Sequence, residues 1–84
     1  MFLHVIGVRQ LSQYSLEITF NNGHVKEVDL SEELYGEVFE PLRDQALFRQ
    51  VYVSEETGTI EWPTGADLAP EYLYEKGVDT RQVA

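Results

Sequence analysis

The segment from residue 14 to residue 20 constrains the fold of this chain most, because its side chains alternate between apolar and polar. Apolar residues occupy the even positions, and polar residues occupy the odd positions between them. In an extended strand, a period of two directs one set of side chains into a core and the other into water. The alternation therefore predicts a half-buried β-strand.

An Asn-Asn-Gly sequence at residues 21–23 follows this strand. Asn-Gly tolerates the positive φ angles that a tight primed hairpin turn requires, so residues 24–30 are predicted to fold back antiparallel. Val28 and Leu30 share one parity, whereas Val25 has the other. Either this strand contains a bulge or Val25 faces the opposite layer, and the sequence leaves both alternatives open.

Further strands are predicted on both sides of this hairpin. Residues 3–8 are rich in β-branched side chains and predict the first strand. Residues 51–54 and 59–62 flank a Glu-Glu-Thr-Gly sequence, whose Gly58 can adopt the turn conformation of a second hairpin. Between the hairpins, apolar spacings of three to five over residues 38–51 predict short helical turns.

Capping residues mark these helical turns. Ser31 is expected to cap a turn directly after it, and Asp44 is expected to cap a helix over residues 45–50. Pro41 is expected to break the helical pattern before Asp44, because proline lacks the backbone N–H that a helix interior needs.

The C-terminal part of the chain contains a loop, a short helix and a tail. A proline and a glycine interrupt the strand pattern within residues 63–67, which predicts a shaped loop. Pro70 stands where the first residue of a helix would be, and the helix over residues 72–76 is expected to stop at Gly77. Residues 79–84 show no periodicity and are predicted to form a disordered tail.

The length of 84 residues fits one domain, because a separate hydrophobic core usually needs about a hundred residues or more. With 43% hydrophobic and 25% charged residues, the composition is that of a globular protein. We predict a single α+β domain over residues 1–78. It is a small two-layer fold in which a mostly antiparallel sheet, with two hairpins and about five strands, packs against short helices.

Charge and composition exclude several classes of function. Six Lys and Arg residues against fifteen Asp and Glu residues give a net charge of -9. This charge repels phosphate backbones and anionic headgroups, so we expect no direct nucleic acid binding and no membrane binding. The chain has no cysteine, which excludes disulfides, thiolate zinc sites and thiol nucleophiles. We expect no cofactor and no metal.

The apolar segment at residues 1–7 is too short to span a bilayer and lacks the basic start of a signal peptide. The expected location is therefore the cytoplasm. A domain of this size buries little apolar surface, so a second subunit would add stability, and a homodimer is expected.

The stretch from Trp62 to Leu73 is the least generic part of the sequence. In a structural interpretation, Trp62 fills the core and Asp67 accepts backbone amides of the loop or of the following helix start. In a functional interpretation, the stretch is a recognition surface, since tyrosine combines rigid contact area with a polar tip. The residues of this candidate interaction surface are Trp62, Thr64, Asp67, Glu71, Tyr72 and Tyr74.

The densest acidic segment contains Glu32, Glu33, Glu37 and Glu40. It is either a solvated surface or an attachment point for a basic protein partner. His4 and His24 are interpreted as strand histidines satisfied by the backbone or by water.

An alternative function is a small-ligand-binding or metal-dependent enzyme. In that interpretation, Asp67, Glu71 and either His4 or His24 line a cleft between the sheet and the helices. No sequence motif specifies a catalytic residue, and the six glycines are scattered rather than clustered in a phosphate-binding loop.

The chain resembles a family of small bacterial proteins, classed as a domain of unknown function, with the C-terminal signature W-P-x-G-A-D-L-x-P-E-x-L. Residues 62–73 match this signature, and the Asn22-Gly23 hairpin, the Val28-Asp29-Leu30 strand and the segment over residues 39–48 precede it in the expected order. The resemblance implies an α+β fold shared with the N-terminal domain of certain helix-turn-helix proteins. Too few residues follow Leu73 for a helix-turn-helix, so direct DNA binding is not carried over.

The resemblance also implies that stand-alone members are often encoded beside another small protein, which points to a paired or antitoxin-like role. We therefore expect a non-enzymatic interaction module that binds a basic protein partner. A DNA-associated regulator that acts only through such a partner is a further alternative.

Overall fold

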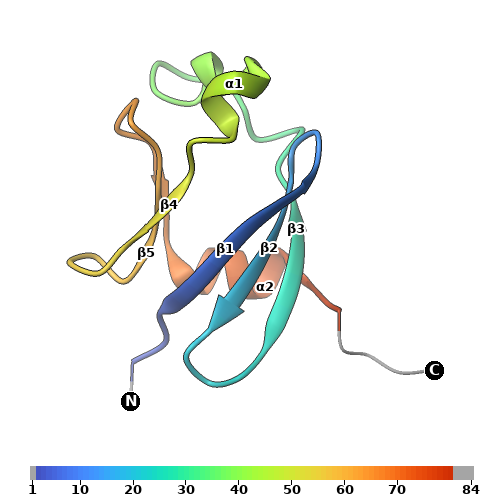
Figure 1. The fold of residues 1–84 in the computed structure, drawn as a ribbon, viewed down its shortest axis with the longest axis vertical. Coiled ribbons are helices and arrows are strands. Elements are labelled where there is room, and N and C mark those ends of the chain that lie inside the picture. The colour runs from blue at the N-terminus through green and yellow to red at the C-terminus, as the bar shows by residue number, and fades with distance from the viewer. Residues whose placement is uncertain (1, 81–84) are drawn as a thin grey trace.

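Within residues 2–80, which the computed structural model describes, the chain forms seven strands, two α-helices and one 3₁₀ helix (Figure 1). The strands are β1 (Val5–Ser12), β2 (Ser15–Phe20), β3 (Val25–Asp29), β4 (Tyr52–Ser54), β5 (Thr59–Glu61), β6 (Asp67–Leu68) and β7 (Val78–Asp79). The helices are the 3₁₀ helix η1 (Glu40–Arg43), α1 (Gln45–Phe48) and α2 (Pro70–Lys76).

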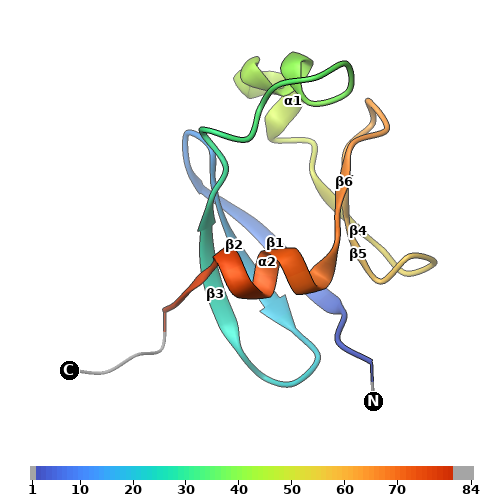
Figure 2. The same ribbon diagram turned by 180° about the vertical axis from the view of Figure 1, so that it is seen from behind.

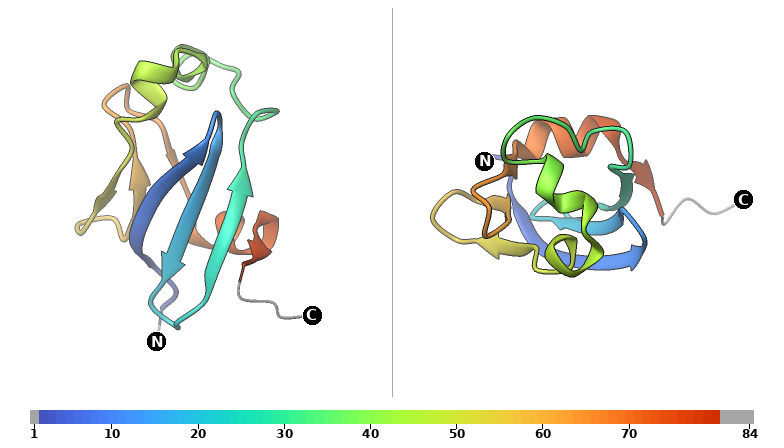
Figure 3. Two further views of the ribbon diagram at one scale, coloured as in Figure 1. Left: turned by 45° about the vertical axis from the view of Figure 1, so that its right-hand side comes forward. Right: turned by 90° about the horizontal axis from the view of Figure 1, so that it is seen from above.

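The strands form two antiparallel sheets. The first sheet has the order β1-β2-β3-β7, and the second has the order β4-β5-β6. Helix α2 lies behind the first sheet, and the second sheet stands beside β1 (Figures 2 and 3). The predicted α+β class with mostly antiparallel strands is confirmed, but the strands form two sheets instead of the one sheet predicted. The short strands β6 and β7 are additional, because neither carries enough residues to show a period in the sequence.

Strand β2 supplies one buried row of the core. Leu16, Ile18 and Phe20 are fully buried, while the residues between them are partly exposed. The alternation over residues 14–20 therefore predicted both the strand and its buried face. The other members of the core are Val5, Val28, Leu30, Leu34, Leu42, Phe48, Ile60, Trp62, Ala66 and Leu73.

Val25 lies on the face of β3 opposite that of Val28, without a bulge. The register of β2 with β3 is continuous across all its residue pairs, which resolves the alternative that the sequence left open. The irregularities fall in β1 instead, where Ile6 and Leu11 interrupt the pairing with β2. Strand β1 also runs four residues beyond the predicted segment 3–8, as far as Ser12.

The turn between β2 and β3 is a three-residue loop. Phe20 N–H donates to His24 O at 2.9 Å, and Gly23 N–H donates to Phe20 O at 3.0 Å. Gly23 has φ +94, and no other residue of this loop has a positive φ. The antiparallel hairpin predicted from Asn-Gly is confirmed. The predicted primed turn is wrong, because such a turn needs positive φ at its first central residue.

A turn with the same hydrogen bonds joins β5 to β6. Trp62 N–H donates to Ala66 O and Gly65 N–H donates to Trp62 O, both at 2.9 Å, and Gly65 has φ +96. The segment over residues 63–67 therefore does not end the sheet pattern. It reverses the chain into a third strand of the second sheet, where Ile60 pairs with Leu68.

The helical turns predicted over residues 38–51 are confirmed in part. The Asp44 carboxylate accepts from Ala46 N–H at 2.9 Å, so the predicted cap is confirmed, although α1 ends at Phe48. Pro41 lies inside the first turn of η1, where its missing N–H costs nothing. Ser31 is no cap: its own N–H donates to the Asp29 carboxylate at 2.9 Å.

The C-terminal helix begins at Pro70, as predicted, and its last residue is Lys76. Gly77 follows with φ -73, so this position does not need the left-handed conformation of a glycine stop. Strand β7 then pairs with β3, and Thr80 N–H donates to Val25 O at 3.0 Å. The predicted tail began at residue 79, whereas β7 includes Asp79; residues 81–84 lie outside the described residues.

Candidate interaction surface

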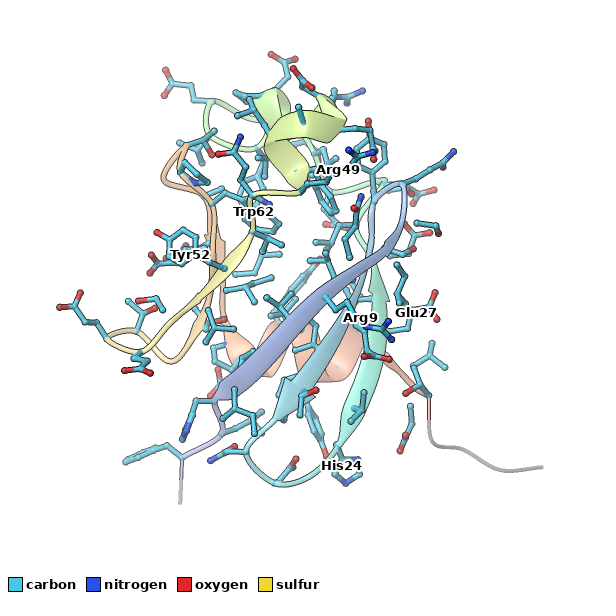
Figure 4. The ribbon with its side chains drawn as sticks, viewed as in Figure 1. Arg9, His24, Glu27, Arg49, Tyr52 and Trp62 are labelled. Atoms are coloured by element: carbon cyan, nitrogen blue, oxygen red, sulfur yellow. The ribbon has the colours of Figure 1, made fainter. Side chains whose placement is uncertain are left out.

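Trp62, the first residue of the predicted interaction surface, lies in the core. Trp62 is 1% exposed, and its Nε1–H donates to Phe48 O at 3.0 Å. The rings of Phe39 and Phe48 lie 6.3 and 5.7 Å from the Trp62 ring, measured between centroids. Figure 4 shows Trp62 between the second sheet and α1. The structural interpretation of Trp62 is confirmed, and its side chain cannot contact a partner.

Tyr74 also has a packing role. Its ring meets the edge of Phe20 at a centroid distance of 5.1 Å and that of His24 at 5.5 Å. Lys26 Nζ lies 4.0 Å from the Tyr74 ring centroid and donates to Tyr74 O at 2.8 Å. This ammonium satisfies a carbonyl in the last turn of α2, where a positive charge is favourable. Tyr74 thus fastens α2 to the first sheet.

Thr64 connects two segments that are distant in the sequence. Its Oγ1–H donates to Val38 O at 2.9 Å, which ties the turn before β6 to the acidic loop over residues 31–39. Because of this contact, the acidic segment and the Trp62–Leu73 stretch belong to one side of the molecule, although the sequence presented them as separate candidates.

A second connection joins the same loop to α2. Lys76 Nζ lies 3.2 Å from Glu33 Oε2, and the Tyr72 hydroxyl also hydrogen-bonds the Glu33 carboxylate. The hydrogen bond from Tyr72, followed by that from Lys76, lowers the pKa of Glu33 below its usual value. Partial burial, followed by the hydrogen bond to Glu33, raises the pKa of Tyr72 to about 12. Glu33 is therefore held as a carboxylate and Tyr72 as a phenol.

An exposed tyrosine lies beside this cluster. Tyr35 is 67% exposed, and it is close enough to raise the pKa of Tyr72 further. Tyr72 is 39% exposed. The sequence analysis missed Tyr35 as a candidate, although an aromatic side chain with a glutamate two positions away on each side was the available signal.

We define the α2 face as the exposed side of α2 together with the adjoining loop. Glu75 and Lys76 line a shallow pocket with Tyr72, one helical turn away. Two tyrosines, two carboxylates and one ammonium group are therefore brought together. The residues of the α2 face are Glu33, Tyr35, Glu71, Tyr72, Glu75 and Lys76, where Glu71 is the exposed residue one turn before Glu75.

Asp67 does not have the role that the structural interpretation gave it. It is exposed, and within residues 2–80 its carboxylate accepts no hydrogen bond. Helix α2 begins without a side-chain cap, since the residue at that position is Ala69. Asp67 instead lies directly opposite Glu61 in the β5–β6 pair, and the Glu61 carboxylate accepts from the Tyr52 and Thr57 hydroxyls.

The residues of the alternative enzyme site do not share one cavity. His4 lines a pocket of about 360 Å³ with Glu55, whereas His24 lines a pocket of about 380 Å³ with Asp79 at another place. Neither Asp67 nor Glu71 lines either pocket. In the part of the chain that is described, no group of three His, Asp or Glu side chains is placed to hold a metal ion.

A family model described as "Protein of unknown function (DUF2442)" matches residues 5–79. The chain belongs to this family. The match spans both sheets and α2, so the DUF2442 domain is the whole fold described above. No curated protein and no solved structure matches the chain. No helix among residues 2–80 has the length and apolar character needed to cross a membrane.

Proposed function

We propose that this DUF2442 chain is a non-enzymatic interaction module, the regulatory or antitoxin-like member of a two-protein pair. Its partner is a basic protein. The observation that carries the proposal is the convergence of the acidic loop with α2, where Lys76 Nζ lies 3.2 Å from Glu33 Oε2, and with the β5–β6 turn, where Thr64 donates to Val38 O at 2.9 Å. Two candidate segments of the sequence thereby form one exposed surface.

The distribution of charge supports a basic partner. The net charge is -9, and most described cations are already held within the chain. Arg9 pairs with Glu17 at 3.2 Å, and Arg43 Nε–H donates to Leu34 O at 2.8 Å. The excess carboxylates therefore stay without an internal counterion, and their summed potential attracts positively charged proteins.

Affinity purification of the tagged chain from its native cells tests this proposal. We expect one stoichiometric partner with a basic isoelectric point, identified by mass spectrometry. Because exposed charges are screened within about 10 Å at 0.1 M salt, the complex is expected to weaken as salt rises. Recovery of no stoichiometric protein, or of an acidic one, would overturn the proposal.

A mobility-shift assay tests whether the protein pair acts as a DNA-associated regulator. The chain alone is expected not to retard DNA, since its charge opposes the phosphate backbone. A supershift of the partner's DNA complex would assign the pair to DNA regulation.

A further inference from the structure

We infer that the α2 face is the docking surface for an arginine-bearing segment of the basic partner, with Lys76 acting as an internal competitor for Glu33. The inference rests on the proposed function, because it specifies the surface and the chemistry of the same interaction. It concerns the α2 face alone, and its tests respond to residues of that face.

The exposed tyrosines favour arginine over lysine. Tyr35 is 67% exposed and Tyr72 39%, and Tyr72 lies against the Glu33 carboxylate and beside Glu75. A guanidinium group stacks on an aromatic ring and pairs with a carboxylate through two parallel hydrogen bonds. An ammonium group is a compact charge that cannot match this planar geometry. A surface of tyrosines and glutamates therefore complements arginine.

Lys76 shows that the face already binds a cation. Its Nζ lies 3.2 Å from Glu33 Oε2, and the two side chains keep 31% and 26% of their surface exposed. A solvent-accessible ion pair of this kind is weak, so an incoming guanidinium can displace the ammonium group. Glu71 and Glu75 have no ion pair or side-chain hydrogen bond within residues 2–80 and are ready to pair with further cations.

Oligoarginine and oligolysine peptides of equal length are the probes. Their binding to the full chain is measured by fluorescence anisotropy at low salt. We expect oligoarginine to bind roughly threefold to fivefold more tightly, as expected for cation–π contacts at exposed sites. Tyr35→Ala should remove this preference. Tyr52→Ala is the matched control, because Tyr52 is also exposed and also next to a carboxylate, but lies on β4 (Figure 4).

Charge variants locate the binding surface. The double variant Glu71→Gln with Glu75→Gln is expected to weaken oligoarginine binding by about fivefold to tenfold, on the scale of two exposed ion pairs. The matched control is Glu55→Gln with Glu56→Gln, which removes the same charge from the β4–β5 turn. That turn projects away from α2 (Figure 2), so a small change is expected there.

Lys76→Met gives the most specific result. Removal of the competitor frees Glu33, so oligoarginine should bind more tightly by about threefold, the scale of one exposed ion pair. Arg49→Met is the control for net charge, since Arg49 is exposed beside α1 (Figure 4) and should produce a smaller change. If Lys76 only stabilises the fold, Lys76→Met should bind oligoarginine as tightly as the wild type or more weakly.

Three outcomes overturn the inference. In the first, the variants of the α2 face bind oligoarginine as tightly as their matched controls. In the second, the wild-type chain shows no preference for arginine. In the third, sedimentation shows that the same variants alter self-association, which would make the α2 face a contact with a second copy. A basic partner whose binding ignores these variants overturns this inference alone, whereas recovery of no basic partner overturns the proposed function.

Discussion

Gly77 brings the end of α2 against β3 so closely that a Cβ at this position would lie 2.8 Å from the Cβ of Lys26. The same added atom would lie 2.9 Å from Leu73 O and 3.1 Å from Val28 Cγ2. Since Gly77 has φ -73, its backbone conformation is open to any residue, and glycine is required for space alone. Gly77→Ala is therefore expected to destabilise the fold by about 1–3 kcal/mol, measured by urea denaturation.

Gly7→Ala is the control for that substitution. A Cβ on Gly7 would meet Thr19 Cβ at 3.4 Å, which is ordinary contact. Alanine in a strand also has less conformational entropy to lose than glycine, so Gly7→Ala is expected to be neutral or stabilising by up to about 1 kcal/mol. Equal effects of the two substitutions would contradict the argument from space.

Asp67 is expected to oppose folding. It lies directly across from Glu61, and like charges at directly opposite positions of an antiparallel pair repel each other. Asp67→Asn is therefore expected to raise the free energy of unfolding by about 0.2–1 kcal/mol. Asp67→Glu keeps the charge and should give little change. A clear loss of stability in Asp67→Asn would restore the amide-accepting role predicted from the sequence.

Trp62 is expected to be among the most sensitive core positions. Trp62→Phe removes the indole N–H that donates to Phe48 O, which leaves this carbonyl only the longer 3.4 Å bond from Val51 N–H, and it opens space next to the Phe39 ring. Loss of a buried hydrogen bond together with a small cavity should cost about 2–4 kcal/mol. Tyr52→Phe, on an exposed side chain, should change stability by less than about 0.5 kcal/mol in the same denaturation experiment. Similar losses in both variants would contradict a core role for Trp62.

The sequence predicted the elements whose signal is local. Alternation over residues 14–20 identified β2 and its buried face, and the Asp44 and Pro70 signals located two helix starts. Strands of two residues carry no period, so β6 and β7 could not be predicted from pattern. Gly77 was correctly predicted to follow the helix, but the reason is tertiary, because the contact with Lys26 exists only after α2 meets β3.

For the candidate surface too, the sequence predicted the local segments but not the tertiary contacts between them. Sequence singled out the acidic segment and the Trp62–Leu73 stretch separately, and neither spacing nor composition could join them. Their union depends on contacts such as that between Glu33 and Lys76, and all three strands of the second sheet lie between these two residues in the chain. Burial likewise separates Trp62 from Tyr72, although both are aromatic residues of one motif.

Tyr72 should titrate apart from the other tyrosines. Its pKa is raised to about 12, whereas an ordinary tyrosine ionises near pH 10. In an absorbance titration of phenolate, one transition near this higher value is expected, and Tyr72→Phe should remove it. Between these two values the unfolded chain binds fewer protons than the folded chain, so stability falls as pH rises through this window. If Tyr35→Phe removes this transition instead, the raised pKa belongs to Tyr35 and not to Tyr72.

Glu33 should make stability depend on acidic pH in the opposite direction. Its pKa is lowered, first by the hydrogen bond from Tyr72 and then by that from Lys76. Stability from these contacts is fully present above the pKa of the unfolded state and is lost as pH falls through the lower folded value. Glu33→Gln removes the titrating group, so its melting temperature should lie below that of the wild type at about pH 7 and approach it at about pH 3.

Glu56→Gln is the control, because Glu56 is exposed in the β4–β5 turn and has no side-chain hydrogen bond or ion pair within residues 2–80. Its melting temperature should follow that of the wild type across the same pH range. If Glu33→Gln keeps a constant difference from the wild type at all pH values, the loss comes from packing rather than from the carboxylate. Lys76→Met should retain part of the dependence on pH, since the hydrogen bond from Tyr72 still holds Glu33 ionised.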